Sequence, residues 1–284
     1  MNSLETAHKH YLNPTVQKEI ADFCRGRWAA IHLMTDRNQL TFRRYFQGKP
    51  LTINKPEDIQ NLMEKLGYKV KAFYATANIY KPINQQTPQK PSLYEVTACT
   101  PTWDLDSQLT YWRDTIKTAQ RIVETLESFG VERSVYIKWS GNGCHIHIHE
   151  QAISEEALSR AHPLDLAYAI VEYINIKLAE KPINPKVKVE NRMDAGRVFT
   201  CPLSLHRNLE TVCICMKPNE LEAFTQEWIK PAEFRHNEKW REFKHGEADE
   251  LAIKAYELIG GYPKGRRRKT KKLDHQIMEW LNRF

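Results

Sequence analysis

The chain has 284 residues, of which 41% are hydrophobic and 27% charged, enough to bury the core of one large domain or two small ones. A net charge of +7 and an isoelectric point near 9.0 are compatible with an anionic partner. The six cysteines form no CxxC pair, so we expect neither a disulfide framework nor a structural zinc. Without a signal peptide or an apolar run of membrane-spanning length, we expect a soluble, cytoplasmic protein that does not bind membranes.

The N-terminal part is predicted to mix helices and strands. Apolar spacing indicates helices at 15–24 and 56–66, each beginning at or beside a proline. Between them, alternating apolar residues predict a strand pair at 28–33 and 40–46, joined by a polar turn. Residues 70–80 are rich in aromatic and β-branched side chains and predict a further strand.

Two carboxylates lie close together in the strand-like stretch 99–106. Side chains alternate along a strand, so Asp104 and Asp106 share one face, with their Cα atoms roughly 7 Å apart. Paired carboxylates repel each other, which is costly unless a cation lies between them. Hard oxygen ligands of this kind suit Mg²⁺ or Mn²⁺. The alternative is a pair of exposed carboxylates at the end of a strand.

A hairpin is predicted from residue 138 to residue 150. The Gly-Asn-Gly sequence at 141–143 is a strong turn signal, because Asn and Gly tolerate positive φ. In the second strand, His145, His147 and His149 alternate with isoleucines and share a face. Such a polar face should line a site. A histidine-bound zinc, copper or iron, or a solvated edge hairpin, are the other interpretations.

The remaining elements are predicted from the same periodicities. Strands are expected at 187–192, 197–206 and 211–216, and helices at 108–129, 154–160, 164–178, 219–228 and 247–258. A cationic run at 264–272 precedes an amphipathic segment at 273–284.

Three motifs, in this order, resemble those of the archaeo-eukaryotic primase superfamily, which includes the small catalytic subunit of replicative primase and the primase-polymerases. The resemblance covers residues 25–215. The motifs are Asp104-Leu-Asp106, Ser140-Gly-Asn-Gly-Cys-His145-Ile-His147, and Asp194 followed by Pro202-Leu-Ser-Leu-His206.

The resemblance implies an α/β (α+β) fold in which an RRM-like catalytic half packs against an N-terminal α/β half, with the active site in the cleft between them. Residues 1–246 would form the catalytic core, and residues 247–284 a C-terminal helix and basic tail. The implied activity is template-directed nucleotidyl transfer that makes or extends primers from NTPs or dNTPs on a single-stranded template. A helicase or a large primase subunit is the protein partner to consider. The rival functions are a metallo-hydrolase or oxygenase built on the histidine strand, and a non-catalytic RRM-like nucleic-acid binder.

The resemblance also assigns roles to residues. The catalytic ligands of two Mg²⁺ or Mn²⁺ ions would be Asp104, Asp106 and Asp194. Nucleotide binding would fall to Ser140, Gly141, Gly143, His145, His206 and Arg197. Thr200 takes the place of the family's basic residue before the Pro-x-Ser segment, and Arg197 or Arg207 would supply that charge. Nucleic-acid contacts are expected from Arg27, Arg43, Arg266, Arg267 and Arg268.

Overall fold

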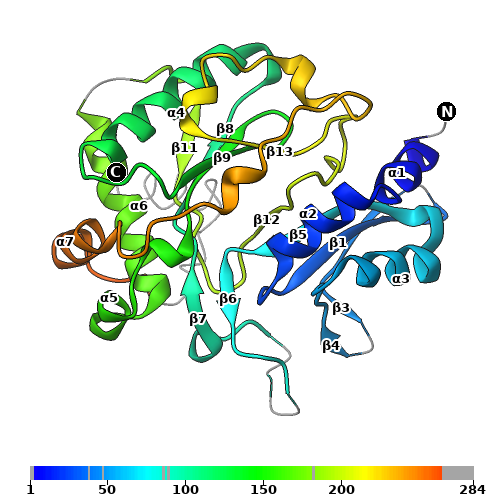
Figure 1. The fold of residues 1–284 in the computed structure, drawn as a ribbon, viewed down its shortest axis with the longest axis horizontal. Coiled ribbons are helices and arrows are strands. Elements are labelled where there is room, and N and C mark those ends of the chain that lie inside the picture. Colours follow the sequence, from blue (N-terminus) through cyan, green and yellow to red (C-terminus); the bar gives the residue numbers. More distant parts are fainter. Residues whose placement is uncertain are drawn as a thin grey trace, which may run out of the picture.

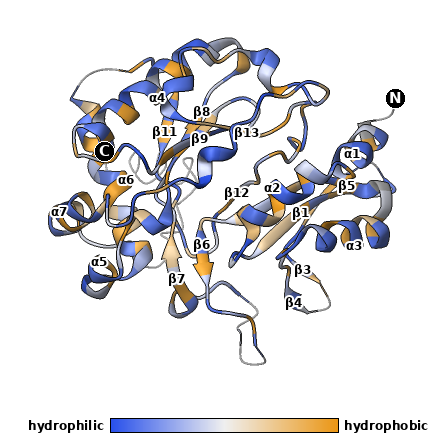
Figure 2. Cartoon of the chain, in the orientation of Figure 1, coloured by the Kyte–Doolittle hydropathy of each residue, from blue (hydrophilic) through white to orange (hydrophobic). Residues whose placement is uncertain are grey.

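The computed structural model of this chain describes residues 3–263 apart from 38, 47, 85, 86, 88, 89, 181 and 182. The predicted tail arginines, Arg266, Arg267 and Arg268, and the amphipathic segment 273–284 lie outside the described residues. Two antiparallel sheets form the framework, each covered on one face by helices (Figure 1). Strands β1 and β7 are mainly apolar, whereas the helices carry both polar and apolar residues (Figure 2).

The N-terminal sheet has four strands and packs against three helices. Its strand order is β12 (Val198–Thr200), β5 (Val70–Thr76), β1 (Ala29–Met34) and β2 (Leu40–Arg43). The helices are α1 (Ser3–Tyr11), α2 (Pro14–Cys24) and α3 (Pro56–Leu66). Strand alternation sends Ile31 and Phe73 into the main core, whereas His32 and Tyr74 point to the opposite face and line a cavity.

The second sheet has five strands. Their order is β11 (Lys188–Glu190), β8 (Thr102–Asp106), β10 (Cys144–Ile148), β9 (Val135–Trp139) and β13 (Ile214–Met216). Helices α4 (Trp112–Glu127) and α6 (Pro163–Ala179) contact this sheet, and α5 (Glu155–Arg160) and α7 (Asp249–Ile259) pack beside them. Two short strand pairs complete the fold: β3 (Tyr45–Phe46) with β4 (Lys49–Pro50), and β6 (Asn78–Tyr80) with β7 (Val96–Cys99).

Buried cations join the two sheets. The fully buried Lys138 donates from Nζ to the carbonyl oxygen of Thr200 at 2.9 Å. Arg27, only 4% exposed, forms a 2.8 Å ion pair with Glu150 and donates to the carbonyl oxygen of Thr76. Arg27, for which the resemblance predicts a contact with nucleic acid, is buried here, and both of its Nη atoms are hydrogen-bonded to protein groups. Arg43 lies exposed at the end of β2.

The predicted α+β fold is confirmed, but several elements differ from those expected. The strand expected at 40–46 is divided between β2 and β3, that at 70–80 between β5 and β6, and that at 197–206 is limited to β12. Helix α1 was not predicted, and the helix expected at 219–228 is replaced by two short 3₁₀ turns, Pro218–Glu220 and Gln226–Ile229. Leu221 and Phe224 are buried from this irregular segment, so their spacing reflects burial and not helical periodicity. Among the described residues, no helix is long and apolar enough to cross a membrane.

Candidate active site

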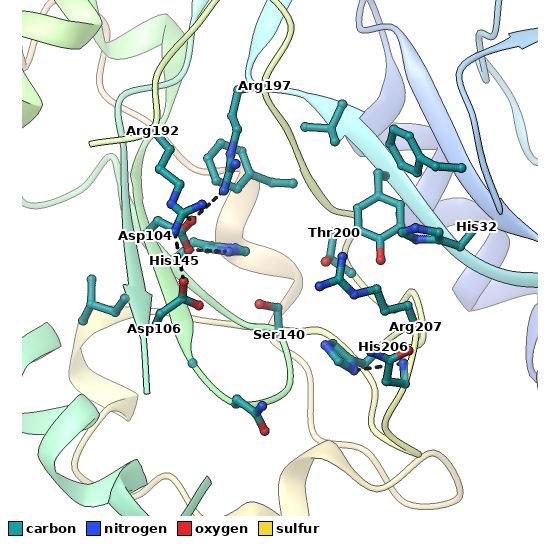
Figure 3. Close-up of a pocket in the computed structure, with 18 residues that line it drawn as sticks. His32, Asp104, Asp106, Ser140, His145, Arg192, Arg197, Thr200, His206 and Arg207 are labelled. Atoms are coloured by element: carbon teal, nitrogen blue, oxygen red, sulfur yellow. Dashed lines mark hydrogen bonds and ion pairs between the residues drawn. The ribbon is translucent and has the colours of Figure 1, made fainter. Parts of the chain in front are cut away.

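The inner faces of the two sheets border a cavity of about 500 Å³ (Figure 3). Asp104 and Asp106 line one wall from β8, and Ser140 reaches the cavity from the β9–β10 turn. His32 and Thr200 lie across the cavity on the N-terminal sheet. The rest of the lining is Phe42, Tyr74, Leu105, Asn142, Gly143, His145, Arg192, Arg197, Val198, Phe199, His206, Arg207 and Asn208.

Asp104 is buried, and neighbouring positively charged side chains compensate its negative charge. It is 5% exposed, and its Oδ2 accepts a 2.6 Å hydrogen bond from Nη2 of Arg197. Its register partner on β10 is His145, whose Nε2 lies 3.3 Å from Asp104 Oδ1. Burial by itself would raise the pKa of Asp104, but the hydrogen bond from His145 and the charges of Arg197 and Arg192 outweigh it, and the pKa is lowered. Asp104 is therefore ionised at neutral pH.

Asp106 differs from Asp104 although the two share a strand face. Its side chain is 58% exposed. Partial burial and the neighbouring charge of Asp104 raise its pKa. The two aspartates therefore differ in acidity: the pKa of Asp104 is lowered and that of Asp106 is raised.

A third carboxylate, that of Glu190, lies beside this pair. Strand β11 pairs with β8 so that Glu190 is the direct partner of Asp104, and the charge of Glu190 contributes to the raised pKa of Asp106. Asp194, the third ligand expected from the sequence, is exposed, and its side chain accepts a hydrogen bond from Gly196 N at 2.7 Å. Neither Glu190 nor Asp194 is among the residues that line the cavity. The sequence signal for Glu190 is the alternation in Lys188-Val-Glu190.

A guanidinium lies among the three carboxylates. Nε of Arg192 is 3.4 Å from Asp104 Oδ2, and Nη2 is 3.5 Å from Asp106 Oδ2 (Figure 3). Nε of Arg192 also donates to Glu190 Oε2 at 3.0 Å. As they stand, no three Asp, Glu, His or Cys side chains among the described residues are placed to hold a metal ion. The donor set nevertheless fits Mg²⁺ or Mn²⁺, because three hard carboxylates converge on one bound positive charge.

Ser140, His206 and Arg207 lie on another side of the cavity (Figure 3). Backbone amides of Asn208 and Leu209 both donate to His206 Nδ1, at 3.3 and 3.0 Å, which leaves the proton of the neutral ring on Nε2. Burial, followed by the charge of Arg207, lowers the pKa of His206 to about 4. His206 is therefore a neutral hydrogen-bond donor at physiological pH.

Both predicted turn glycines are required by close contacts. Gly141 has φ of 103°, and a Cβ there would lie 2.8 Å from the His206 ring. A Cβ on Gly143 would come within 1.9 Å of the Leu105 carbonyl oxygen. These glycines let the turn lie directly against β8 and His206, so Ser140 reaches the cavity.

The N-terminal sheet contributes a group of aromatic rings whose meeting is not evident from the sequence. The rings of His32, Phe42 and Tyr74 pack together, with centroids 4.9 to 5.8 Å apart. Phe42 is 43% exposed, which is unusual for so large an apolar side chain. The rings come from three strands, β1, β2 and β5, and alternation within each strand gives no hint that they meet.

The three hairpin histidines do not converge on one point. His147 is 1% exposed, bonds to Thr102 Oγ1 through Nδ1 at 2.8 Å and stacks on Tyr136. His149 stacks on Phe243 and caps the following turn. Only His145 of the three lines the cavity among the described residues. A shared histidine metal site is therefore not supported.

Comparison with solved structures places the fold. The polymerase domain of Mycobacterium tuberculosis ligase D, solved in complex with DNA, superposes with a TM-score of 0.53 and 13% identity over 91% of this chain and 90% of that chain. The chain has an α+β fold similar to that of this polymerase domain. A structure of primase RepB′ superposes less well, with a TM-score of 0.38 and 10% identity, covering 99% of this chain and 67% of that chain. No protein-family model and no curated protein sequence matches this chain.

The buried histidines predict a loss of stability in mild acid. Burial holds the pKa of His147 well below 6.5, and that of His206 near 4. Below pH 6.5 the unfolded chain binds protons that the folded chain does not, so the free energy of unfolding should fall between pH 6.5 and 4. Each such histidine contributes a slope of about 1.4 kcal/mol per pH unit. Urea denaturation at several pH values measures this.

The control variant is His147→Gln, which should reduce that slope because the side chain no longer titrates. Carboxylates do not account for the loss above pH 5. The pKa values of Glu19 and Glu150 are both lowered to about 2, so their contributions are lost only as the pH falls below about 4.5. A free energy of unfolding that stays constant from pH 7 to 5 would contradict the prediction.

Proposed function

We propose that this protein is a template-directed nucleotidyltransferase of the primase-polymerase type, which makes or extends primers from NTPs or dNTPs on a single-stranded template. One observation carries the proposal: Asp104 and Asp106 line the same cavity as side chains that could donate hydrogen bonds to phosphate, in a fold similar to that of a polymerase domain solved with DNA. The rival histidine-based metalloenzyme loses its support, because His145, His147 and His149 have separate environments.

The carboxylates Asp104, Asp106 and Glu190 would hold Mg²⁺ or Mn²⁺, with Glu190 in the role that the sequence resemblance gave to Asp194. When bound, such ions neutralise phosphate charge and activate the attacking 3′-hydroxyl. His145 holds Asp104 in place through Oδ1, which leaves the more solvent-accessible Asp106 to adjust. His145 thus acts in this proposal mainly as a positioning residue.

The triphosphate would lie against Ser140, His206 and Arg207. The hydroxyl and the Nε2–H group are neutral donors, and the guanidinium adds a charge that matches phosphate geometry. Arg197, which also lines the cavity, replaces the basic residue expected at Thr200. The exposed ring of Phe42 and its partners His32 and Tyr74 offer a face on which a base can stack.

Removing the phosphate donors should weaken nucleotide binding. We expect Ser140→Ala and His206→Ala each to cost about 1–3 kcal/mol of nucleotide binding free energy, since each deletes a hydrogen bond to a charged group. Titration of a nucleoside triphosphate into the protein without template measures this. His245→Ala is the control, because His245 is exposed and does not line the cavity. Unchanged affinity in both variants would refute the assigned phosphate position.

The activity is tested with a single-stranded template, each nucleotide set, and Mn²⁺ or Mg²⁺, with and without a primer. Elongated product that requires the template and a divalent metal is expected. Template binding without any synthesis, unaffected by substitution of Asp104 or Asp106, would instead indicate a non-catalytic nucleic-acid binder. Synthesis without a primer would separate priming from extension. A helicase or large-subunit partner is a further proposal, which pull-down with purified candidates would test.

A further inference from the structure

We infer that Arg192 is a tethered counter-cation that occupies the metal position of the carboxylate cluster, so that Arg192 and a divalent metal exclude each other. The inference rests on the proposed function insofar as that function places a metal here. Arg192 has no assigned role in the sequence motifs. It comes from the loop that follows β11 and reaches into the cavity wall formed by β8 (Figure 3).

The contacts of Arg192 are those expected of a cation held by several ligands. One guanidinium contacts carboxylates of Asp104, Asp106 and Glu190, which come from two adjacent strands. Among the described residues, every ion pair of Asp106 and of Glu190 goes to Arg192. A metal ion bound by the same oxygens would lie where the guanidinium now lies, and the two positive charges would repel each other.

The second arginine of the cluster has a different position. Arg197 forms an ion pair with Asp104, and among the described residues it forms none with Asp106 or Glu190. With Arg192 removed, one guanidinium would therefore remain for three carboxylates. The three carboxylates would then repel one another with less compensation. Because a divalent cation relieves this repulsion, we expect the cluster without Arg192 to bind such a cation more tightly.

The local structure allows Arg192 to leave without unfolding. Its neighbours are anchored: Asn191 Nδ2 donates to the carbonyl oxygen of Tyr168 at 3.2 Å, and Met193 is 3% exposed. The side chain of Arg192 itself is 41% exposed, so it can rotate toward solvent while its backbone stays in place. The exchange is thus a side-chain movement, which occurs rapidly at exposed positions.

The test is a titration of the full chain with Mn²⁺ in the absence of nucleotide and template. Electron paramagnetic resonance measures the concentration of free Mn²⁺ at each step. We expect Arg192→Gln to bind Mn²⁺ about tenfold more tightly than the parent protein, or better. Arg192→Lys, which keeps the charge but lacks the planar fork, should fall between them. Arg207→Gln is the matched control, because Arg207 lines the same cavity and, among the described residues, forms no ion pair with the three carboxylates.

Thermal melting with and without Mn²⁺ is a second measurement, and it shows whether the variant is less stable than the parent protein. Without metal, Arg192→Gln should melt below the parent, and Mn²⁺ should raise its melting temperature by more than it raises that of the parent. The inference is overturned if Arg192→Gln binds Mn²⁺ no more tightly than the parent, or if Arg207→Gln shows the same gain. Because these measurements involve no synthesis, a protein that fails the template assay can still pass them, and the two failures are distinguishable.

Discussion

Asp106→Asn should abolish nucleotide incorporation while leaving the protein folded. The substitution removes a charged oxygen ligand from the carboxylate cluster, and we expect the rate on a primed template to fall about a thousandfold or more. Folding should persist because the side chain is 58% exposed and because its pKa is raised by burial and by Asp104, so loss of its charge relieves repulsion. Single-turnover incorporation with Mn²⁺, together with thermal melting, measures both effects.

Two comparisons make the Asp106 result specific. Asp36→Asn removes a surface carboxylate whose side chain is 87% exposed, and should change neither rate nor stability. Asp104→Asn should lose synthesis and also stability, because Asp104 is buried and pairs with Arg197, which would lose its partner. Substantial synthesis by Asp106→Asn would disprove the assignment of Asp106 as a metal ligand.

Glu19→Ala should cost about 3–5 kcal/mol of unfolding free energy, the largest single effect we expect on stability. The Glu19 carboxylate is fully buried on α2 and accepts from His236 Nε2 at 3.0 Å and from Trp240 Nε1 at 2.8 Å. It also pairs with Arg241, so truncation would leave several buried donors without an acceptor. Burial by itself would raise the pKa of Glu19, but the hydrogen bonds from these partners bring it down to about 2.

Urea denaturation at pH 7 measures this loss. Glu238→Ala is a matched control, because Glu238 also pairs with Arg241 but its side chain is 60% exposed, and we expect a change within about 0.5 kcal/mol. A loss below about 1 kcal/mol for Glu19→Ala would show that the buried donors find other partners. We expect the Glu19→Ala protein that remains folded to keep the activity of the parent protein, since Glu19 does not line the cavity.

The Asp104 contrast shows where reasoning from the sequence falls short. Repulsion between two carboxylates predicts that removing either one leaves the metal-free protein as stable or more stable. For Asp106 we still expect this result, because burial and this repulsion raise its pKa. The prediction fails for Asp104, because Arg197 lies ninety-three residues further along the chain and its hydrogen bond to Asp104 depends on tertiary packing.

The sequence by itself determined the features that depend on neighbouring residues. Strand alternation placed Asp104 and Asp106 on one face, and the Gly-Asn-Gly turn at 141–143 predicted the β9–β10 hairpin. Helices α2, α3, α4 and α6 were predicted from apolar periodicity within a few residues of their ends. These signals are local, because backbone conformation and side-chain direction repeat over a few residues.

Only the tertiary structure decided which distant side chains meet. Strand pairing between β11 and β8 brought Glu190 to the aspartates and left Asp194 exposed, although both lie in the same short stretch of sequence. Tertiary packing also gives each histidine of the 145–149 stretch a different partner, although side chains at every second position of a strand share a face. The register between strands is set by the packing of the whole sheet, and a shift of one residue reverses which side chains face the site.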